Sequence, residues 1–497
     1  MLTSTTEDQV EMEAHALSAH ALSALSLSAM SLEDALTTFA RRHLDATRDS
    51  VVGAQVAGDP AVLWLCIEKI RGAERFTKDE EKIAVRILKE LARIVVRAVS
   101  VAAMEQENVK LLVHLDDNLL PVMELIAAIT EGIATASPTR SDTEFVRWTP
   151  FAIYMSCFFS CGHLPAYDAL RCTDIAARVL EVCQRLHGVS SREELFSKTI
   201  DRIASLSSQD TSKKEWTAQH TIQKHVLEWI LLHVPSPHLG GDLLGRLLAL
   251  VFPLIDDLTN STQIVGARML LHIVKSVTPT ELRWYTDVLL EVLRGAITSR
   301  KALTLDLLLE TLVLALDKVS PRDDFQYYDR FVPRLLTDFS LCSEIELRVL
   351  YTRHLRPVIS RLGAPHSLYL IRFLQPLLKV LVASFDSVQG DFLLETLKTL
   401  RAVVLGAWPR IRGHSERIFV GVLKVVALYE VFRGGLDQTP SSEIKQEVVE
   451  LCEEIVVLLH DLDGPHVQQM VDQVEASTPG MKPFAVRINK KIQILAP

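Results

Sequence analysis

Apolar residues recur at steps of three and four along most of this chain, and the clearest case lies at residues 244–274. This spacing places the apolar side chains on one face of a helix with 3.6 residues per turn. Short polar residues at 256–262 interrupt the pattern and favour a turn, because their side chains bond nearby backbone groups. We expect Ser261 or Thr262 to cap the second helix. The predicted hairpin buries Leu244, Leu247, Leu248, Val251, Ile255 and Leu258 in its first helix and Val265, Met269, Ile273 and Val274 in its second.

Similar hairpins return about every forty residues towards the C-terminus, a period typical of helical repeats. Pro253, Pro333 and Pro376 occupy comparable places in their first helices, where proline removes a backbone donor and kinks the helix. The segment at 285–297 has the same pattern without proline. A kinked first helix is typical of HEAT-type hairpins. We therefore predict an all-α fold, an α-solenoid of HEAT-like helical hairpins, with five or six hairpins between about 240 and 480.

The N-terminal half is less regular but keeps the helical period, and no alternation of period two predicts a sheet. We divide the chain into a low-complexity segment at 1–50, irregular helical repeats at 51–240 and HEAT-like repeats at 241–497. The Ala-Leu-Ser tract at 14–31 fits either a poorly ordered tail or a helix. Loops are predicted at Ser137–Thr143, Ser205–Lys214, Pro235–Gly241 and Arg433–Ser442 from their Ser, Gly and Pro content.

Composition narrows the class of protein. The 497 residues are 48% hydrophobic and carry a net charge of −9, which disfavours a general nucleic-acid binder. Every long apolar run is interrupted by charge, so we expect no membrane association. The first forty residues include Glu7, Asp8, Glu11 and Glu13 but no Lys or Arg before Arg41, unlike a secretory or mitochondrial leader. With seven scattered cysteines, these features predict a reduced setting, cytoplasmic with the nucleus as a further location.

Few residues suggest chemistry. A helical zinc enzyme is one hypothesis, because thiols and imidazoles bind zinc, but the C-x3-C-x-H spacing also fits buried thiols on one helix face. The acid pairs at 116–117, 256–257 and 323–324 are interpreted as helix-end or turn residues, and His272 as a structural histidine. No nucleotide-binding, zinc-protease or nucleophile-elbow motif occurs. We predict no enzyme, no cofactor and no metal. The residues considered as zinc ligands are Cys157, Cys161, His163, Cys172, Cys183 and His187.

Two aromatic sites raise a sharper question. Trp284 and Tyr285 open one hairpin, and Trp408-Pro409-Arg410 closes another. Trp and Arg are common anchors of protein interfaces, yet they also fill the space between repeats. The sequence leaves both interpretations open for these residues.

An ordered set of segments resembles a known family. The segments are IDDLTNSTQIVGARMLLHIVKSVTPTELRWY, LRVLYTRHLRPVISRLG and ETLKTLRAVVLGAWPRI, and they cover about 245–415. In that order they are similar to the Tti-two family, the second Tel-interacting protein of the Triple-T co-chaperone complex. The resemblance rests on Asp256, Asp257, Gly266, Leu271, His272, Trp284, Tyr285, Tyr351, Arg353, Leu355, Leu362, Gly363, Leu397, Trp408, Pro409 and Arg410.

The resemblance implies a non-enzymatic scaffold. Its expected partners are the first Tel-interacting protein, itself a HEAT-repeat chain, and the Tel-two subunit. Through them it implies work with the ninety-kilodalton heat-shock chaperone and its RuvB-like ATPase on phosphatidylinositol-kinase-related kinases, and hence roles in DNA-damage signalling, telomere maintenance and nutrient signalling. The alternative is another HEAT-type adaptor, such as a transport or vesicle-trafficking solenoid. The predicted partner-binding residues are Trp284, Tyr285, Tyr351, Arg353, Trp408 and Arg410.

Overall fold

The structure is a computed structural model that describes most of the chain. The described residues are 31–39, 60–73, 76–104, 109–136, 145–162, 171–208, 216, 221–431 and 442–495. They are almost entirely helical, and no strand occurs among them. The Ala-Leu-Ser tract lies outside them except for Ser31. Two compact units, Met1–Ser276 and Val277–Pro497, are called unit 1 and unit 2.

Unit 1 is a stack of antiparallel helices, each packed on its neighbours. In this unit α5 packs against α3, α4 and α7, α6 packs against α4 and α7, and α10 bridges α8 and α12. Its helices are α2 (Leu32–Phe39), α3 (Pro60–Gly72), α4 (Lys78–Met104), α5 (Val109–Ala136), α6 (Phe145–Ser160), α7 (Arg171–His187), α8 (Arg192–Ser208), α10 (Thr221–Leu232), α11 (Asp242–Ile255) and α12 (Asn260–Ser276).

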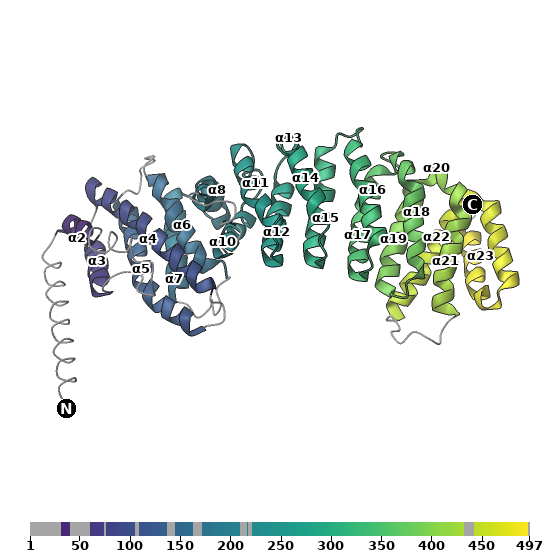
Figure 1. The fold of residues 1–497 in the computed structure, drawn as a ribbon, viewed down its shortest axis with the longest axis horizontal. Coiled ribbons are helices and arrows are strands. Elements are labelled where there is room, and N and C mark those ends of the chain that lie inside the picture. Colours follow the sequence, from purple (N-terminus) through teal and green to yellow (C-terminus); the bar gives the residue numbers. More distant parts are fainter. Residues whose placement is uncertain are drawn as a thin grey trace, which may run out of the picture. The chain divides into compact units, whose positions relative to one another are not determined.

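Unit 2 repeats a simple hairpin. The first helices are α14 (Thr286–Ala296), α16 (Gln326–Leu341), α18 (Leu374–Ala383) and α21 (Ser415–Glu430). They pair with the second helices α15 (Ala302–Val319), α17 (Ile345–Leu362), α19 (Gly390–Gly406) and α22 (Ser442–Ser477). Neighbouring second helices lie side by side, α15 on α17, α17 on α19 and α19 on α22 (Figure 1). The remaining elements are α13 (Pro279–Arg283), η4 (Tyr369–Phe373), η5 (Ser384–Asp386), α20 (Trp408–Ile411), η6 (Arg412–His414), η7 (Pro479–Met481) and α23 (Lys482–Leu495), which packs on α22.

This packing confirms the predicted all-α solenoid of helical hairpins. Each hairpin buries one apolar face against its partner helix and another against the next hairpin, so the repeats share a continuous core. The prolines take the places expected of them, with Pro253 inside α11, Pro333 inside α16 and Pro376 in the first turn of α18. The division at 1–50, 51–240 and 241–497 stays a prediction.

The hairpin at 244–274 forms as expected, with two corrections at its turn. The apolar residues predicted for α11 are buried up to Ile255, but Leu258 is fully exposed. The helix ends at Ile255 and Asp256 is its C-cap, so the apolar spacing runs past the helical segment. The second helix begins at Asn260, which places Ser261 and Thr262 in its first turn rather than at the cap. Helix ends are set by local hydrogen bonds that periodicity does not record.

Other local predictions have mixed outcomes. Thr77 and Glu80 form a capping box at the start of α4. Pro235–Gly241 is a turn region as predicted. The predicted loop at Ser205–Lys214 begins too early, because α8 continues to Ser208, and the acid pair at 116–117 lies inside α5 rather than at a helix end. The loop at Ser137–Thr143 and nearly all of Arg433–Ser442 fall outside the described residues.

Candidate partner-binding surface

The turns that lead into the first helices of unit 2 lie along one edge, here called the turn edge. It comprises residues 277–285, 320–325, 363–373 and 407–414, which precede α14, α16, α18 and α21. Because every hairpin reverses the chain, successive first helices begin on the same side. Figure 1 shows α13 and α20 together on that edge of unit 2. The two aromatic sites singled out in the sequence therefore belong to one surface.

Trp284 is the most exposed tryptophan at this edge, with 84% of its surface accessible. It follows α13, a short helix that begins with Pro279 and is held by a capping box between Thr278 and Glu281. The Trp284 N–H donates to the Glu281 carbonyl, which closes the turn and directs the indole outward. Tyr285, of intermediate exposure, precedes α14. An indole this exposed on a short, capped turn is suited to anchor a partner, because Trp is enriched among interface hot spots.

Trp408 stands on a similar feature. It begins α20, where Pro409 occupies the first turn and the Arg410 N–H donates to the Ala407 carbonyl. The ring is 51% exposed and Arg410 is exposed, so neither residue fills the core between repeats. The structure thus places Trp408 at the surface, which decides the question that the sequence left open about its burial.

Glycines hold this part of the turn edge in place. A Cβ added at Gly363 would lie 2.7 Å from the Cα of Gly406, and the Ala364 N–H donates to the Gly406 carbonyl at 2.9 Å. The turn before η4 is thereby fastened to the end of α19, just before Trp408. Gly266 acts similarly in unit 1, where a Cβ would lie 2.8 Å from the Leu254 Cβ. Close backbone approach gives a physical reason for two glycines that carry the family resemblance.

Polar contacts between repeats stiffen the same edge. The Arg361 guanidinium donates to Asp317 at 3.0 Å and stacks over the Phe325 ring at 5.1 Å. Tyr369 donates to Asp329 at 2.5 Å across the next turn. Lys318 donates to the Val277 carbonyl at 2.8 Å. These contacts tie the turns at 277–285, 320–325 and 363–373 to neighbouring helices, which holds the support of Trp284 in place.

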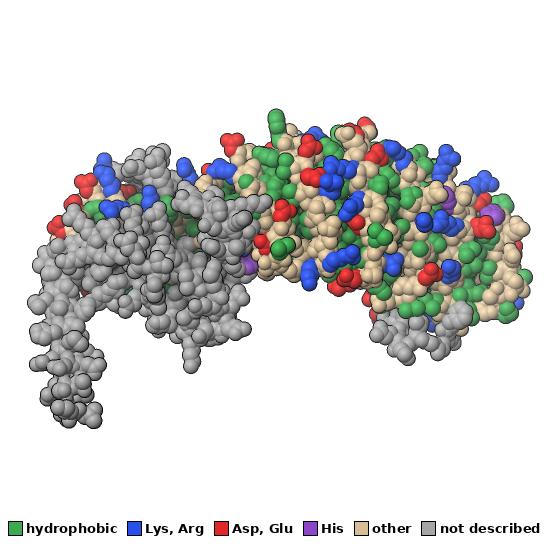
Figure 2. Space-filling model, viewed as in Figure 1, with side chains coloured by type: hydrophobic (Ala, Val, Ile, Leu, Met, Phe, Trp, Pro, Cys, Tyr) green, Lys and Arg blue, Asp and Glu red, His purple; other side chains and the backbone are tan. Residues whose placement is uncertain are grey.

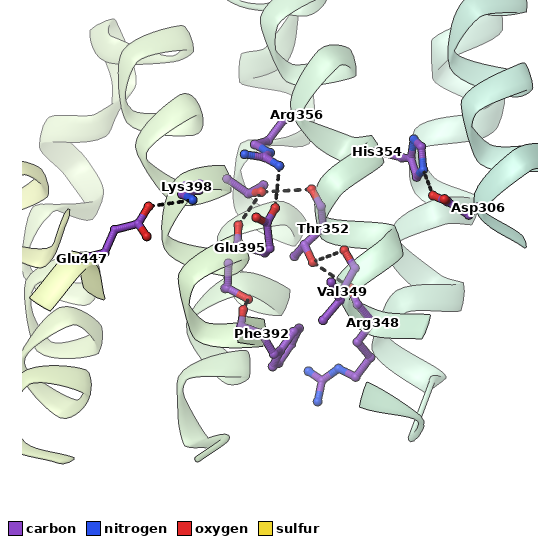
Figure 3. A network of polar contacts seen from close by, with 12 residues as sticks. Asp306, Arg348, Val349, Thr352, His354, Arg356, Phe392, Glu395, Lys398 and Glu447 are labelled. Carbon is purple, nitrogen blue, oxygen red and sulfur yellow. Dashed lines mark hydrogen bonds and ion pairs between the residues drawn. The ribbon is translucent and has the colours of Figure 1, made fainter. Parts of the chain in front are cut away.

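A second row of contacts joins the second helices of the hairpins (Figure 3). His354 and Asp306 meet at 2.6 Å between α17 and α15, Arg356 pairs with Glu395 on α19, and Lys398 pairs with Glu447 on α22 at 2.8 Å. Partly buried pairs of this kind set the register between neighbouring repeats. They hold the stack together, which leaves the turn edge as the candidate surface for partners.

Two predicted contact residues lie on α17, in contrasting places. Tyr351 is 5% exposed and its hydroxyl donates to the Ile297 carbonyl at 3.4 Å, while burial raises the pKa of Tyr351 to about 12. A buried ring does not reach a partner, so we leave Tyr351 out of the candidate surface and assign it to the core. Arg353 is exposed on the same helix.

The residues weighed for zinc do not converge among those that the structure describes, where no three of His, Cys, Asp or Glu form a metal-sized group. The Cys157 and Cys183 thiols are buried and free, and burial raises the pKa of Cys183 to about 12. His187 bonds Thr149 at 2.9 Å, and His163 lies outside the described residues. The acids at 257 and 324 accept turn N–H groups, and His272 bonds the Val234 carbonyl at 2.9 Å.

Surface charge is mixed rather than segregated. On the face seen in Figure 2, Lys and Arg side chains alternate with Asp and Glu along the described part of unit 2. Recognition on such a surface depends on individual well-placed side chains more than on a broad field. None of the described helices combines the length and apolar character needed to cross a bilayer.

Comparison with known proteins finds similarity to proteins of the same name from three mammals. The sequence is 25% identical over 323 residues to "TELO2-interacting protein 2" of Homo sapiens, which is 62% of this chain and 60% of that protein. The protein of the same name from Mus musculus is 24% identical over 279 residues, or 54% of this chain and 52% of the mouse protein. The chain is a distant relative of TELO2-interacting protein 2. The expected resemblance to the Tti-two family is confirmed, over little more than half the length of the relatives.

Other comparisons add little to this. No family model matches the sequence of this relative of TELO2-interacting protein 2. Among solved structures, Kap121p bound to RanGTP has a TM-score of 0.43 at 11% identity, covering 92% of this chain and 44% of that one. An engineered protein has a TM-score of 0.36 at 14% identity, covering 86% and 98%. At these scores the solved structures bear on neither partner nor function.

Proposed function

We propose that this chain is a non-enzymatic scaffold subunit of a Triple-T-type complex. The main support for this proposal is the sequence similarity of the chain to TELO2-interacting protein 2 of three mammals. On this proposal it binds the Tel-two subunit and the first Tel-interacting protein, in the cytoplasm and also in the nucleus. Through them it supports chaperone-dependent folding of phosphatidylinositol-kinase-related kinases and the telomere and DNA-damage responses that depend on those kinases. The ninety-kilodalton heat-shock chaperone and its RuvB-like ATPase would act on the same assembly.

The turn edge of unit 2 is the proposed contact surface. Trp284 and Trp408 supply large exposed rings, with Tyr285 and Arg410 close to them in sequence. Arg353, exposed on α17, is a further proposed contact outside this edge. Aromatic and Arg anchors surrounded by near-neutral contacts carry most of the affinity in protein interfaces. The contacts that tie the turns to neighbouring helices support the proposal, because an anchor held in place loses little entropy on binding.

The direct test is affinity purification of the tagged chain from its own cells, followed by mass spectrometry. We expect a HEAT-repeat protein of the first Tel-interacting class and Tel-two to be recovered at gentle salt. Recovery of neither protein, with the bait folded and soluble, would contradict the proposal.

A double variant then tests the surface. Trp284→Ala with Trp408→Ala should reduce recovery of the partner by about tenfold or more, since one hot spot contributes about 2 kcal/mol. Trp64→Ala is the matched control, because Trp64 is 40% exposed on α3 in unit 1. Equal recovery with the double variant and the control would remove the turn edge from the proposal while leaving the assembly itself in place.

A further inference from the structure

A groove runs between the first helices α16 and α18 of unit 2, and Phe373 is the one residue of the turn edge that lines it. Its volume is about 380 Å³. Its walls are mainly apolar, with two cationic side chains and two hydroxyls among them. The lining residues used below are Pro333, Thr337 and Ser340 of α16, Arg348 of α17, and Pro376 and Lys379 of α18.

The first observation is that the Arg348 guanidinium forms no ion pair with a described carboxylate. Arg348 lies 4.6 Å from the centre of the Phe392 ring and 5.4 Å from that of Phe339, and its Nη2 donates to Ser384 Oγ at 2.9 Å. Figure 3 shows its side chain reaching alongside Phe392. Its Nε is buried without an acceptor, and among the described carboxylates none forms an ion pair with it. Burial lowers the pKa of this guanidinium, a sign that water compensates its charge poorly.

The second observation is a second positive charge, that of Lys379, at the exposed rim of the groove. Lys379 is exposed on α18 and lines the groove, and it forms no ion pair with any carboxylate that the structure describes. Nearby arginines on α16 and η4 are used differently, since Arg334 pairs with Asp338 at 2.8 Å and Arg372 with Asp329 at 2.9 Å. The groove therefore holds the cations that its own neighbourhood leaves uncompensated.

The hydroxyls complete the chemistry of the groove. Thr337 donates its proton to the Pro333 carbonyl at 2.8 Å, and Ser340 donates to the Thr337 carbonyl at 2.8 Å. A hydroxyl has a single proton to donate, so both oxygens are left as acceptors. Two cations and two acceptors suit a carboxylate and a backbone N–H. The exposed faces of Pro333 and Pro376 suit an apolar side chain between them.

We propose that this groove binds a short segment of a partner protein that carries an acidic side chain next to an apolar one. The carboxylate lies against Arg348 and Lys379, and the apolar side chain packs on Pro333 and Pro376. A segment laid between two helices is a common mode of peptide recognition, and a carboxylate relieves the cost of a half-buried, unpaired guanidinium. A free inorganic anion would leave the apolar walls uncovered. The inference does not depend on the proposed Triple-T role.

A random dodecapeptide library displayed on phage and selected on the whole immobilised chain provides the probe. We expect enrichment of Asp or Glu next to Leu, Phe or Trp. The selected peptide, labelled with fluorescein, should bind about tenfold more weakly to Lys379→Met and to Arg348→Met, the range for a lost charge-assisted hydrogen bond. Arg417→Met is the matched control, an exposed arginine on α21 outside the groove, and should bind as the parent chain does.

A second measurement guards against misfolding of the Arg348 variant. Replacing the acidic residue of the peptide by its amide should weaken binding to the parent chain about tenfold and weaken it much less for Lys379→Met, since the lost interaction is shared. Lys379 is exposed, so its variant tests the groove without disturbing the core. Selected peptides without acidic enrichment, or unchanged affinity for Lys379→Met, would overturn the proposal. Because the library contains no Tel protein, failure of the proposed assembly would not affect this outcome.

Discussion

Gly363 and Gly406 meet backbone to backbone where the turn before η4 crosses the end of α19, with room for no Cβ on Gly363. The contact joins two neighbouring hairpins of unit 2. It also fixes the backbone immediately before Trp408, which stands exposed at the turn edge. A contact between two repeats thus determines the position of a candidate anchor.

Gly363→Ala should destabilise the protein by about 1–3 kcal/mol, because the added methyl group meets backbone rather than a side chain that can move aside. The φ of Gly363 is −96°, so the cost is steric rather than conformational. Urea unfolding followed by circular dichroism measures it. Gly295→Ala is the control, since a Cβ there meets nothing within 4 Å and an alanine inside α14 should be neutral or stabilising. Equal stability of the two variants would refute the close contact.

Trp284→Ala should change the free energy of unfolding by no more than about 0.5 kcal/mol, as is usual for exposed sites. Trp148 on α6 is 1% exposed, and its replacement by alanine should lower the free energy of unfolding by about 3–5 kcal/mol. Thermal unfolding of both variants beside the parent chain makes the comparison. A large loss of stability with Trp284→Ala would mean that its ring packs within the fold, contrary to its exposure here.

Acidification should destabilise the protein partly through His187. Burial, followed by the nearby Lys198 charge, lowers the pKa of His187 below its usual 6.5. The folded state therefore favours the neutral imidazole, and between the two pKa values the unfolded chain binds more protons. The stabilisation is complete above about pH 6.5 and is lost as the pH falls towards the folded pKa.

The measurement is the free energy of unfolding across that range for the parent chain and His187→Gln. The parent should lose more stability on acidification than the variant does. His238→Gln, which alters an exposed histidine in a turn, should follow the parent. Parallel curves for the parent and His187→Gln would rule out the assigned effect.

The cysteines should resist alkylation while the protein is folded. All seven are buried and none is in a disulfide, and burial raises the pKa of Cys66 to about 11 and that of Cys183 to about 12. Because the thiolate is the reactive form, iodoacetamide at about pH 8 should label the folded chain slowly. Intact mass spectrometry should show full labelling in concentrated urea. Rapid labelling of the folded chain would contradict the burial of the labelled thiol.

The helices were predictable because their apolar residues recur with the helical period, and only one face of such a helix can be buried. Leu244, Leu248 and Val251 show this directly, since all are buried as expected. Leu258 shows the limit. It keeps the spacing but lies beyond the C-cap at Asp256, and a spacing rule does not register where the hydrogen bonds stop.

Whether a single aromatic residue is exposed or buried was not predictable from the sequence. Trp284, Trp408 and Tyr351 all carry the family resemblance, yet the two tryptophans are exposed and the tyrosine is buried. The difference comes from where each stands. Short helices at hairpin junctions direct the indoles outward, whereas Tyr351 lies on the side of α17 that contacts other repeats, within reach of the Ile297 carbonyl.

By itself the sequence determined the helical class, the hairpin period and the family resemblance, because these depend on spacing and residue type along one stretch of chain. Tertiary structure alone decided which anchors are exposed and where the groove lies. Arg348 and Lys379 come from different helices and Phe392 from a third, so their relation exists only after the hairpins stack. Burial and charge compensation are properties of such assembled neighbourhoods, and no local pattern encodes them.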